Sequence, residues 1–251
     1  MISIVADVHG AAEALRRVAV GGGPLLVLGD LINFIDYRTN EGIVTEVSGE
    51  EIVGRFIDLR MSGDHEGAGR LWREHARGRE DELRDRYEEV IVAAYQDVLA
   101  ALDGCEAYVT YGNVDRPDLL AAMLPESARF VDGEVVAIEG LRVGFAGGGT
   151  VSINTPGEVS DDEMAAKLEA LGDVDLLCTH VPPAVEELAA DVIAGRQKGS
   201  PAVLDYIQRR RPPYHYFGDI HQPRASEWRV AETLCRNAGY FRATGRAVHH
   251  H

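Results

Sequence analysis

Carboxylates and histidines follow several apolar runs in this sequence, at the positions where β-strands would end. Asp7 and His9 come directly after the run Ile2–Ala6, and Asp30 follows the run Leu25–Leu28 through a single glycine. Later runs are followed in the same way by Asn113, His180, Asp219 and His221. Oxygen and imidazole ligands together suit a divalent ion of intermediate hardness, such as Mn, Fe, Zn or Ni. These residue types therefore predict a metal centre.

The apolar runs are typical of the strands of an α/β protein. The first two flank a helix predicted over Ala11–Val20, and a right-handed crossover makes them parallel, with both carboxyl ends on one edge of the sheet. Further strands are predicted at 107–111, 134–138, 141–146, 175–179, 214–217 and 228–234, and further helices at 161–171 and 201–210. Ligand sites in α/β sheets collect at the carboxyl ends of strands, so the polar residues can converge. The simplest architecture is two packed mixed β-sheets with helices outside.

The segment from about residue 36 to 104 differs from the rest of the chain. A polar stretch with many glycines over 41–69 is followed by a helical stripe of apolar residues between Leu71 and Leu102. We interpret the segment as a mainly helical insertion into one domain over residues 1–248. It would either cap the site or cover one face of a sheet. His249-His250-His251 suggest the remnant of a purification tag.

The charge balance and the cysteines limit the partners and the compartment. A net charge of −16 disfavours a nucleic-acid polymer as partner, whereas a bound metal could still attract a small phosphorylated substrate. The three cysteines fit no metal spacing, and Cys178 in an apolar run is expected to be a reduced core thiol. The sequence also lacks a signal-peptide pattern and an apolar stretch of membrane-spanning length, so we expect a cytoplasmic protein that does not bind membranes. The oligomeric state stays open.

The order of the short motifs resembles that of the calcineurin-like metallophosphoesterase superfamily. The motifs are Asp-x-His at 7–9, Gly-Asp-x-x-Asn at 29–33, Gly-Asn-x-Asp at 112–115, Thr-His at 179–180 and Gly-x-x-His at 218–221. Gly147-Gly148 followed by Asn154-Thr155-Pro156, and the run from Thr179 to Pro183, are similar to a subgroup of small prokaryotic phosphoesterases. The resemblance covers the chain outside the insertion. It implies a four-layer fold of two packed β-sheets flanked by helices.

The resemblance implies a site for two divalent ions, with Mn or Fe expected first and Zn or Ni as alternatives. One ion would be held by Asp7, His9, Asp30 and His221. The second would be held by Asp30 as a bridge together with Asn113, His180 and Asp219. A hydroxide bridging the ions would attack phosphorus, with Asp30, Asn113 and His180 in the catalytic centre. The expected enzyme is thus a hydrolase, a phosphatase or phosphodiesterase acting on a phosphomonoester or phosphodiester.

Three neighbouring residues are candidates for supporting roles. Asn33 and Asp115 are expected to brace the ligands through hydrogen bonds, as metal sites generally require. Arg116 follows the Asn113 motif closely enough to contact a phosphoryl group, and a surface salt bridge is the alternative.

Two positions depart from the family pattern. Val114 stands where the family commonly carries a histidine that is a candidate general acid, so either the substrate has a good leaving group or another residue, such as His215, His65 or His75, supplies the proton. Asp219 stands where the family has the first histidine of Gly-His-x-His. It either binds the second ion as a carboxylate, or that ion is weakly bound or absent.

The departures also allow a second hypothesis, a non-catalytic binding or scaffold module on a degraded site. A DNA nuclease is disfavoured by the acidic balance.

Overall fold

The computed structural model describes residues 1–152, 155–192 and 196–251, and it divides into two compact units. The larger unit comprises Met1–Leu31 and Asp97–His251, and the smaller one is Ile32–Gln96. The larger unit contains both major sheets and every predicted metal ligand, whereas Asn33, a predicted supporting residue, belongs to the smaller unit.

The first sheet has five strands in the order β15-β1-β2-β3-β4. Its elements are β1 (Ile2–Val5), β2 (Leu25–Leu28), β3 (Ala107–Thr110), β4 (Ala128–Phe130) and β15 (Val248–His250). The strands β1 to β4 are parallel, and β15 pairs with β1 in the antiparallel direction. The parallel crossovers run through α1 (Ala12–Ala19), the helical segment ending in η1 (Ala100–Leu102), and α6 (Pro117–Met123). The carboxyl ends of four strands therefore meet at one edge.

The second sheet has six strands in the order β13-β14-β12-β9-β6-β5. Its elements are β5 (Glu134–Ile138), β6 (Leu141–Ala146), β9 (Leu176–Thr179), β12 (Tyr214–Phe217), β13 (Glu227–Val230) and β14 (Thr233–Asn237). Strands β6, β9, β12 and β14 are parallel, and the edge strands β5 and β13 are antiparallel to their neighbours. Two small ribbons pair β7 (Gly149–Thr150) with β8 (Glu158–Val159), and β10 (Ala190–Asp191) with β11 (Arg196–Gln197).

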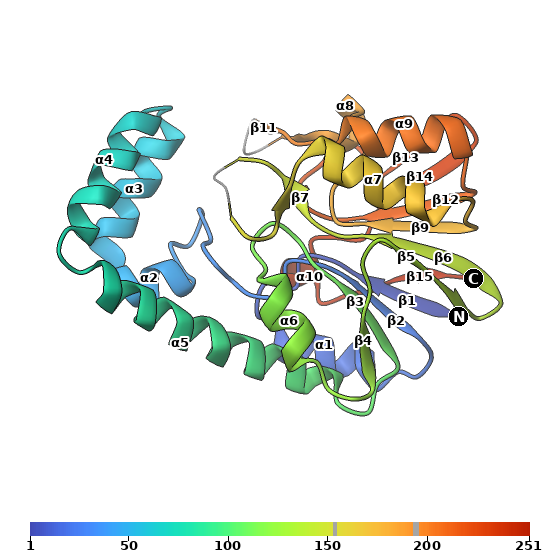
Figure 1. Ribbon diagram of the computed structural model, residues 1–251, viewed down its shortest axis with the longest axis horizontal. Helices are drawn as coiled ribbons and strands as arrows, with labels where there is room; N and C mark the ends of the chain where they lie inside the picture. The colour runs from blue at the N-terminus through green and yellow to red at the C-terminus, as the bar shows by residue number, and fades with distance from the viewer. Residues whose placement is uncertain (153–154, 193–195) are drawn as a thin grey trace. The chain divides into compact units, whose positions relative to one another are not determined.

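A continuous apolar core lies between the two sheets. Ile4, Leu26 and Leu28 of the first sheet pack with Phe145 and Leu176 of the second, and all five are fully buried. A second core joins the outer face of the second sheet to α7 (Asp161–Leu171) and α9 (Pro201–Arg210), which Figure 1 shows side by side above that sheet. Short helices α8 (Glu186–Ala189) and α10 (Phe241–Thr244) complete the unit. The predicted architecture, two mixed β-sheets flanked by helices, is confirmed.

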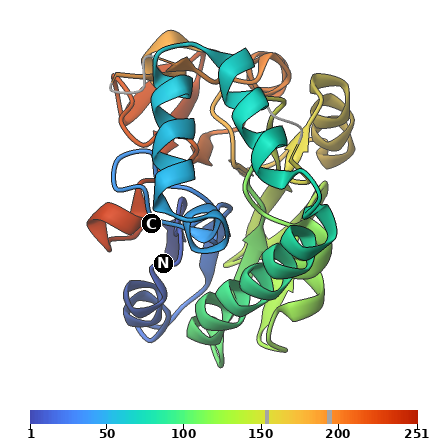
Figure 2. The same ribbon diagram turned by 90° about the vertical axis from the view of Figure 1, so that its left-hand side faces the viewer.

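The smaller unit is helical. It contains α2 (Ile43–Ser48), α3 (Glu50–Met61), α4 (His65–Ala76) and most of α5 (Glu80–Leu99). Helices α3 and α4 lie side by side, as Figure 2 shows, and the unit has its own apolar cluster around Val44, Val53 and Ile57. The predicted insertion ran from about 36 to 104, and its proposed role as a cap stays a prediction. Every helix within the described ranges is too short or too polar to cross a bilayer.

The chain differs from the sequence prediction at its C-terminal end. The single strand predicted at 228–234 is instead the hairpin β13–β14, because Ala231 adopts a left-handed backbone (φ 51°) that turns the chain between the two strands. His249 and His250, which the sequence suggested as part of a tag, belong to β15 and pair with β1. The His250 Nδ1 lies 3.1 Å from the hydroxyl of the buried Tyr216.

The core between the sheets should carry much of the stability. Leu176 lies in the middle of that core with no exposed surface, so Leu176→Ala should lower the free energy of unfolding by about 2–5 kcal/mol, through lost burial and the cavity left behind. Val20, which is 79% exposed, offers a matched control, and Val20→Ala should change it by less than about 0.5 kcal/mol. Urea unfolding measures both variants. Equal losses would contradict the assignment of this core.

Candidate metal centre

The predicted ligands stand at the carboxyl ends of strands from both sheets. Asp7 follows β1, Asp30 follows β2 through Gly29, and Asp219 follows β12 through Gly218. All three aspartates have left-handed backbones, with φ of 57°, 54° and 64°. Aspartate tolerates this conformation better than most residues, and it turns the chain sharply where the strand stops. The side chains are thereby directed into the space beyond the strand ends.

One group of possible metal ligands consists of Asp7, His9 and His221. One ligand atom of each lies within 4.8 Å of the others. The Nε2 atoms of His9 and His221 face each other at 3.1 Å, and His221 Nε2 is 3.9 Å from Asp7 Oδ1. Tyr240 stacks on the His221 ring, with centroids 4.0 Å apart and planes at 5°. This stacking fixes the ring orientation that points the nitrogen at the group.

A second group shares Asp7 and adds Asp30 and His180, with ligand atoms again within 4.8 Å. His180 Nε2 lies 3.5 Å from Asp30 Oδ1 and 3.3 Å from Asn113 Oδ1. The other ring nitrogen, Nδ1, donates to the Leu28 carbonyl at 2.8 Å. Since Nδ1 carries that proton, the neutral ring presents a bare Nε2 to the centre, as a metal ligand must.

The donor set fits a cation. Among the described residues, the buried Oδ2 atom of Asp7 has no hydrogen-bond partner. A buried carboxylate oxygen without a partner is costly, and a bound cation would satisfy it. The chain thus has Asp and His groups able to hold metal ions.

Asp219 lies beside these groups in a different environment. Its Oδ1 accepts a hydrogen bond from the Lys198 ammonium at 2.7 Å, and its backbone N–H donates to Asp7 Oδ1 at 3.1 Å. It belongs to neither of the two groups found among the described His, Cys, Asp and Glu residues. Lys198, one of only two lysines in the chain, was not predicted for the site from the sequence.

Asp115 braces the Asp30 loop. Its carboxylate accepts hydrogen bonds from the backbone N–H groups of Asp30 at 2.8 Å, Leu31 at 3.1 Å and Gly112 at 2.8 Å. Burial and the nearby Asp30 charge raise the pKa of Asp115 to about 6. The β-carbon of a residue replacing Gly112 would lie 2.2 Å from Asp30 Oδ1, so only glycine allows this approach.

The remaining candidates have varied positions. Arg116 pairs with Asp118, its Nη2 lying 3.3 Å from Oδ2. Asn33 belongs to the smaller unit, so its bracing role stays a prediction, as do proton donation by His65 and His75. His215 is fully buried against Thr179 Oγ1 at 2.8 Å, and burial lowers its pKa to about 3, which leaves it neutral and unsuited as a proton donor. Asn154 of the Asn-Thr-Pro motif lies outside the described residues.

The electrostatics of the centre reflect three carboxylates and three imidazoles in close proximity. Burial raises the pKa of Asp7. Burial also acts to raise the pKa of Asp30, but the charges of His180 and His9 outweigh it and hold that pKa below its usual value. Burial disfavours protonated His180, yet Asp30, Asp219 and Asp7 outweigh it and raise the pKa of His180 to about 8. The cluster therefore attracts positive charge strongly.

Comparisons with known proteins support the fold and leave the activity open. No family model and no curated protein matches the sequence. One crystal structure is similar over 96% of this chain and 90% of that chain, with a TM-score of 0.64 and 15% sequence identity. The crystal structure of TT1561 of Thermus thermophilus is similar over 96% of this chain and 89% of that one, with a TM-score of 0.56 and 14% identity. At such identities these likenesses show a shared fold alone.

The raised pKa of His180 gives metal binding a defined pH dependence. Below about pH 8 the metal-free ring carries a proton on Nε2, which a metal must displace. Divalent-ion affinity should therefore fall about tenfold per pH unit as the pH drops from about 8 to 6. Burial, foremost, lowers the pKa of His221, so that ring should release a smaller fraction of a proton than His180 does. Calorimetry in two buffers of different ionisation enthalpy counts the released protons. A pH-independent affinity would contradict this account.

Proposed function

We propose that this chain is a metal-dependent phosphoesterase that hydrolyses a phosphomonoester or phosphodiester. The observation that carries the proposal is the convergence of the two groups Asp7–His9–His221 and Asp7–Asp30–His180 beyond the strand ends, with Asp7 common to both. Divalent ions bound there would polarise a phosphoryl group and lower the pKa of water. Two carboxylates, three imidazoles and the Asn113 amide favour Mn or Fe, with Zn or Ni as alternatives.

The protein's own residues hold these ligands in place before any ion binds. The Leu28 carbonyl keeps the proton of the neutral His180 ring on Nδ1, so Nε2 is the atom that faces the ion site once its own proton is lost. The Val114 N–H donates to Asp30 Oδ1 at 3.1 Å, and Asp115 fixes the backbone on both sides of Asp30. Preorganisation of this kind lets a site stabilise developing charge without moving during the reaction. The motif order that resembles the calcineurin-like metallophosphoesterases points to the same chemistry.

Asp30 should be indispensable. Asp30→Asn removes a buried charge from the second group, so Mn-dependent hydrolysis should fall by more than about 100-fold. Even the substitution of a residue that only orients a metal ligand lowers metal affinity or activity by about 10–100-fold. The wild-type protein should also melt at a higher temperature with Mn than with chelator, since an ion that binds the native state stabilises it. Asp30→Asn should lose most of this difference.

The exposed Asp103 provides the matched control, and Asp103→Asn should keep both the hydrolysis and the melting shift. Assays use a panel of phosphomonoesters and phosphodiesters with added Mn. If the wild-type protein binds Mn tightly and cleaves no member of the panel, the scaffold hypothesis is favoured over the phosphoesterase.

Leaving-group chemistry should reveal the absence of an acid at position 114. Val114 cannot donate a proton from its side chain, so the rate should depend steeply on the leaving-group pKa, with aryl esters cleaved far faster than alkyl esters. Val114→His should accelerate alkyl substrates selectively, by up to ~10²–10⁴-fold. Single-turnover kinetics on matched aryl and alkyl phosphates measure the effect. Equal wild-type rates for the two, with chemistry rate-limiting, would mean that another residue is already the acid.

A further inference from the structure

Lys198 brings a positive charge to the carboxylates of the metal centre. Its Nζ atom is 2.7 Å from Asp219 Oδ1. The negative charges of Asp30 and Asp7 attract the same ammonium, which holds it at the centre. The side chain is nevertheless 33% exposed. A charge that is both close to the centre and reachable from solvent can contact a ligand.

The geometry of an ammonium leaves room for such a ligand. A lysine ammonium has three donors, and Asp219 Oδ1 accepts one of them. An anion that arrived beside Asp219 could accept another without breaking this ion pair. Phosphoryl oxygens are suitable acceptors, since hydrogen bonds between ionised partners are short and strong.

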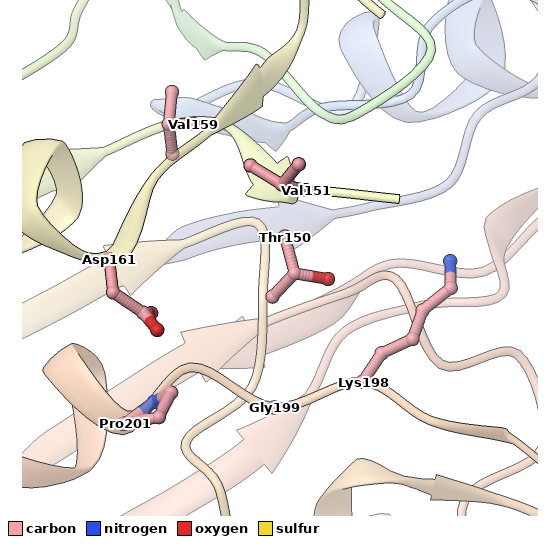
Figure 3. Close-up of a pocket in the computed structure, with 7 residues that line it drawn as sticks. All are labelled: Thr150, Val151, Val159, Asp161, Lys198, Gly199 and Pro201. Carbon is pink, nitrogen blue, oxygen red and sulfur yellow. The ribbon is translucent and has the colours of Figure 1, made fainter. Parts of the chain in front are cut away.

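Lys198 also lines a cavity. The cavity has a volume of about 380 Å³, and its other lining residues are Thr150, Val151, Val159, Asp161, Gly199 and Pro201. Such a volume is within the range of small-molecule sites, about 300–1,000 Å³. In Figure 3 the Lys198 ammonium and the Asp161 carboxylate lie on opposite sides of Thr150. Lys198 therefore connects the metal centre to a space of small-ligand size.

We propose that Lys198 binds the phosphoryl group of the substrate, and that this cavity receives the alcohol part of a small phosphoester carrying hydroxyl or ammonium groups. The proposal rests on the proposed function, and it adds the residue and the substrate class. The Asp161 carboxylate accepts hydrogen bonds and repels anions, so it favours an alcohol part with hydrogen-bond donors over one with a second phosphate. Val151, Val159 and Pro201 supply apolar walls for its carbon atoms.

Substitution of Lys198 should have opposite effects on two ligands. Lys198→Met keeps a similar length without charge, so inorganic phosphate should bind the Mn-loaded protein about tenfold to a hundredfold more weakly. Mn itself should bind more tightly, because Asp219 loses its competing cation. Lys198→Arg should retain most of the phosphate affinity. Damage to the fold would lower the affinities for phosphate and Mn together. Opposite changes in the two affinities therefore identify a direct contact between Lys198 and phosphate.

The cavity is tested with two phosphonates, which resist hydrolysis. Propylphosphonate and dihydroxypropylphosphonate differ only in two hydroxyl groups, and the second should bind the wild-type protein about tenfold more tightly. Asp161→Ala should remove this preference. Asp162→Ala is the matched control, because Asp162 is the next residue of α7 and is not one of the described residues that line the cavity. This variant should keep the preference.

Calorimetry measures all of these affinities without turnover, so the outcome is independent of catalysis. Unchanged phosphate affinity in Lys198→Met, or an equal preference in wild type and Asp161→Ala, overturns the proposal even if the protein hydrolyses phosphoesters. Conversely, a protein that cleaves nothing but shows both dependences refutes the phosphoesterase activity and keeps the small-phosphoester site.

Discussion

Repulsion between buried carboxylates is the constraint on which this site depends. Asp7, Asp30 and Asp219 lie at 0%, 3% and 7% exposure, where the solvent that normally screens such charges is excluded. The protein offsets part of the repulsion with backbone N–H groups, from Asp219 to Asp7 and from Val114 to Asp30. Positive charge offsets the rest, and it comes from Lys198, from protonated His180 and from any bound metal. A cation that bound this centre would therefore stabilise the folded protein further.

The two-sheet fold makes such crowding possible. Parallel strands deliver their carboxyl ends to one edge, and the core between the sheets holds the β1 and β2 ends against those of β9 and β12. Each aspartate then turns out of its strand through a left-handed backbone. Asp115, which follows β3, joins the ends of β2 and β3. Its carboxylate accepts hydrogen bonds from the backbone N–H groups of Asp30, Leu31 and Gly112 at the same time. The position of Asp30 is therefore fixed through backbone contacts.

The sequence predicts those parts of the protein that local patterns determine. The strands at 25–28, 134–138, 141–146 and 214–217 and the helices at 161–171 and 201–210 have the predicted bounds, because each is a strong apolar pattern ended by a glycine, a proline or a polar residue. The hairpin at 227–237 was predicted wrongly, since Ala231 gives no signal for a left-handed turn. Tyr240 and Lys198 were not predicted for the site either. Their roles depend on contacts with His221 and Asp219 made only in the folded chain.

The Asp219–Lys198 pair has a consequence that a histidine at position 219 would not have. A neutral imidazole and an ion pair carry the same net charge, but only the pair can be separated by a cation. A metal that drew Asp219 toward it would weaken the bond to Nζ and leave the ammonium freer to bind an anion. An anion bound to another donor of the ammonium would in turn weaken its attraction for Asp219 and favour the metal, because coupling between two ligands is reciprocal. Metal and phosphate would thus each promote the binding of the other through one contact of 2.7 Å.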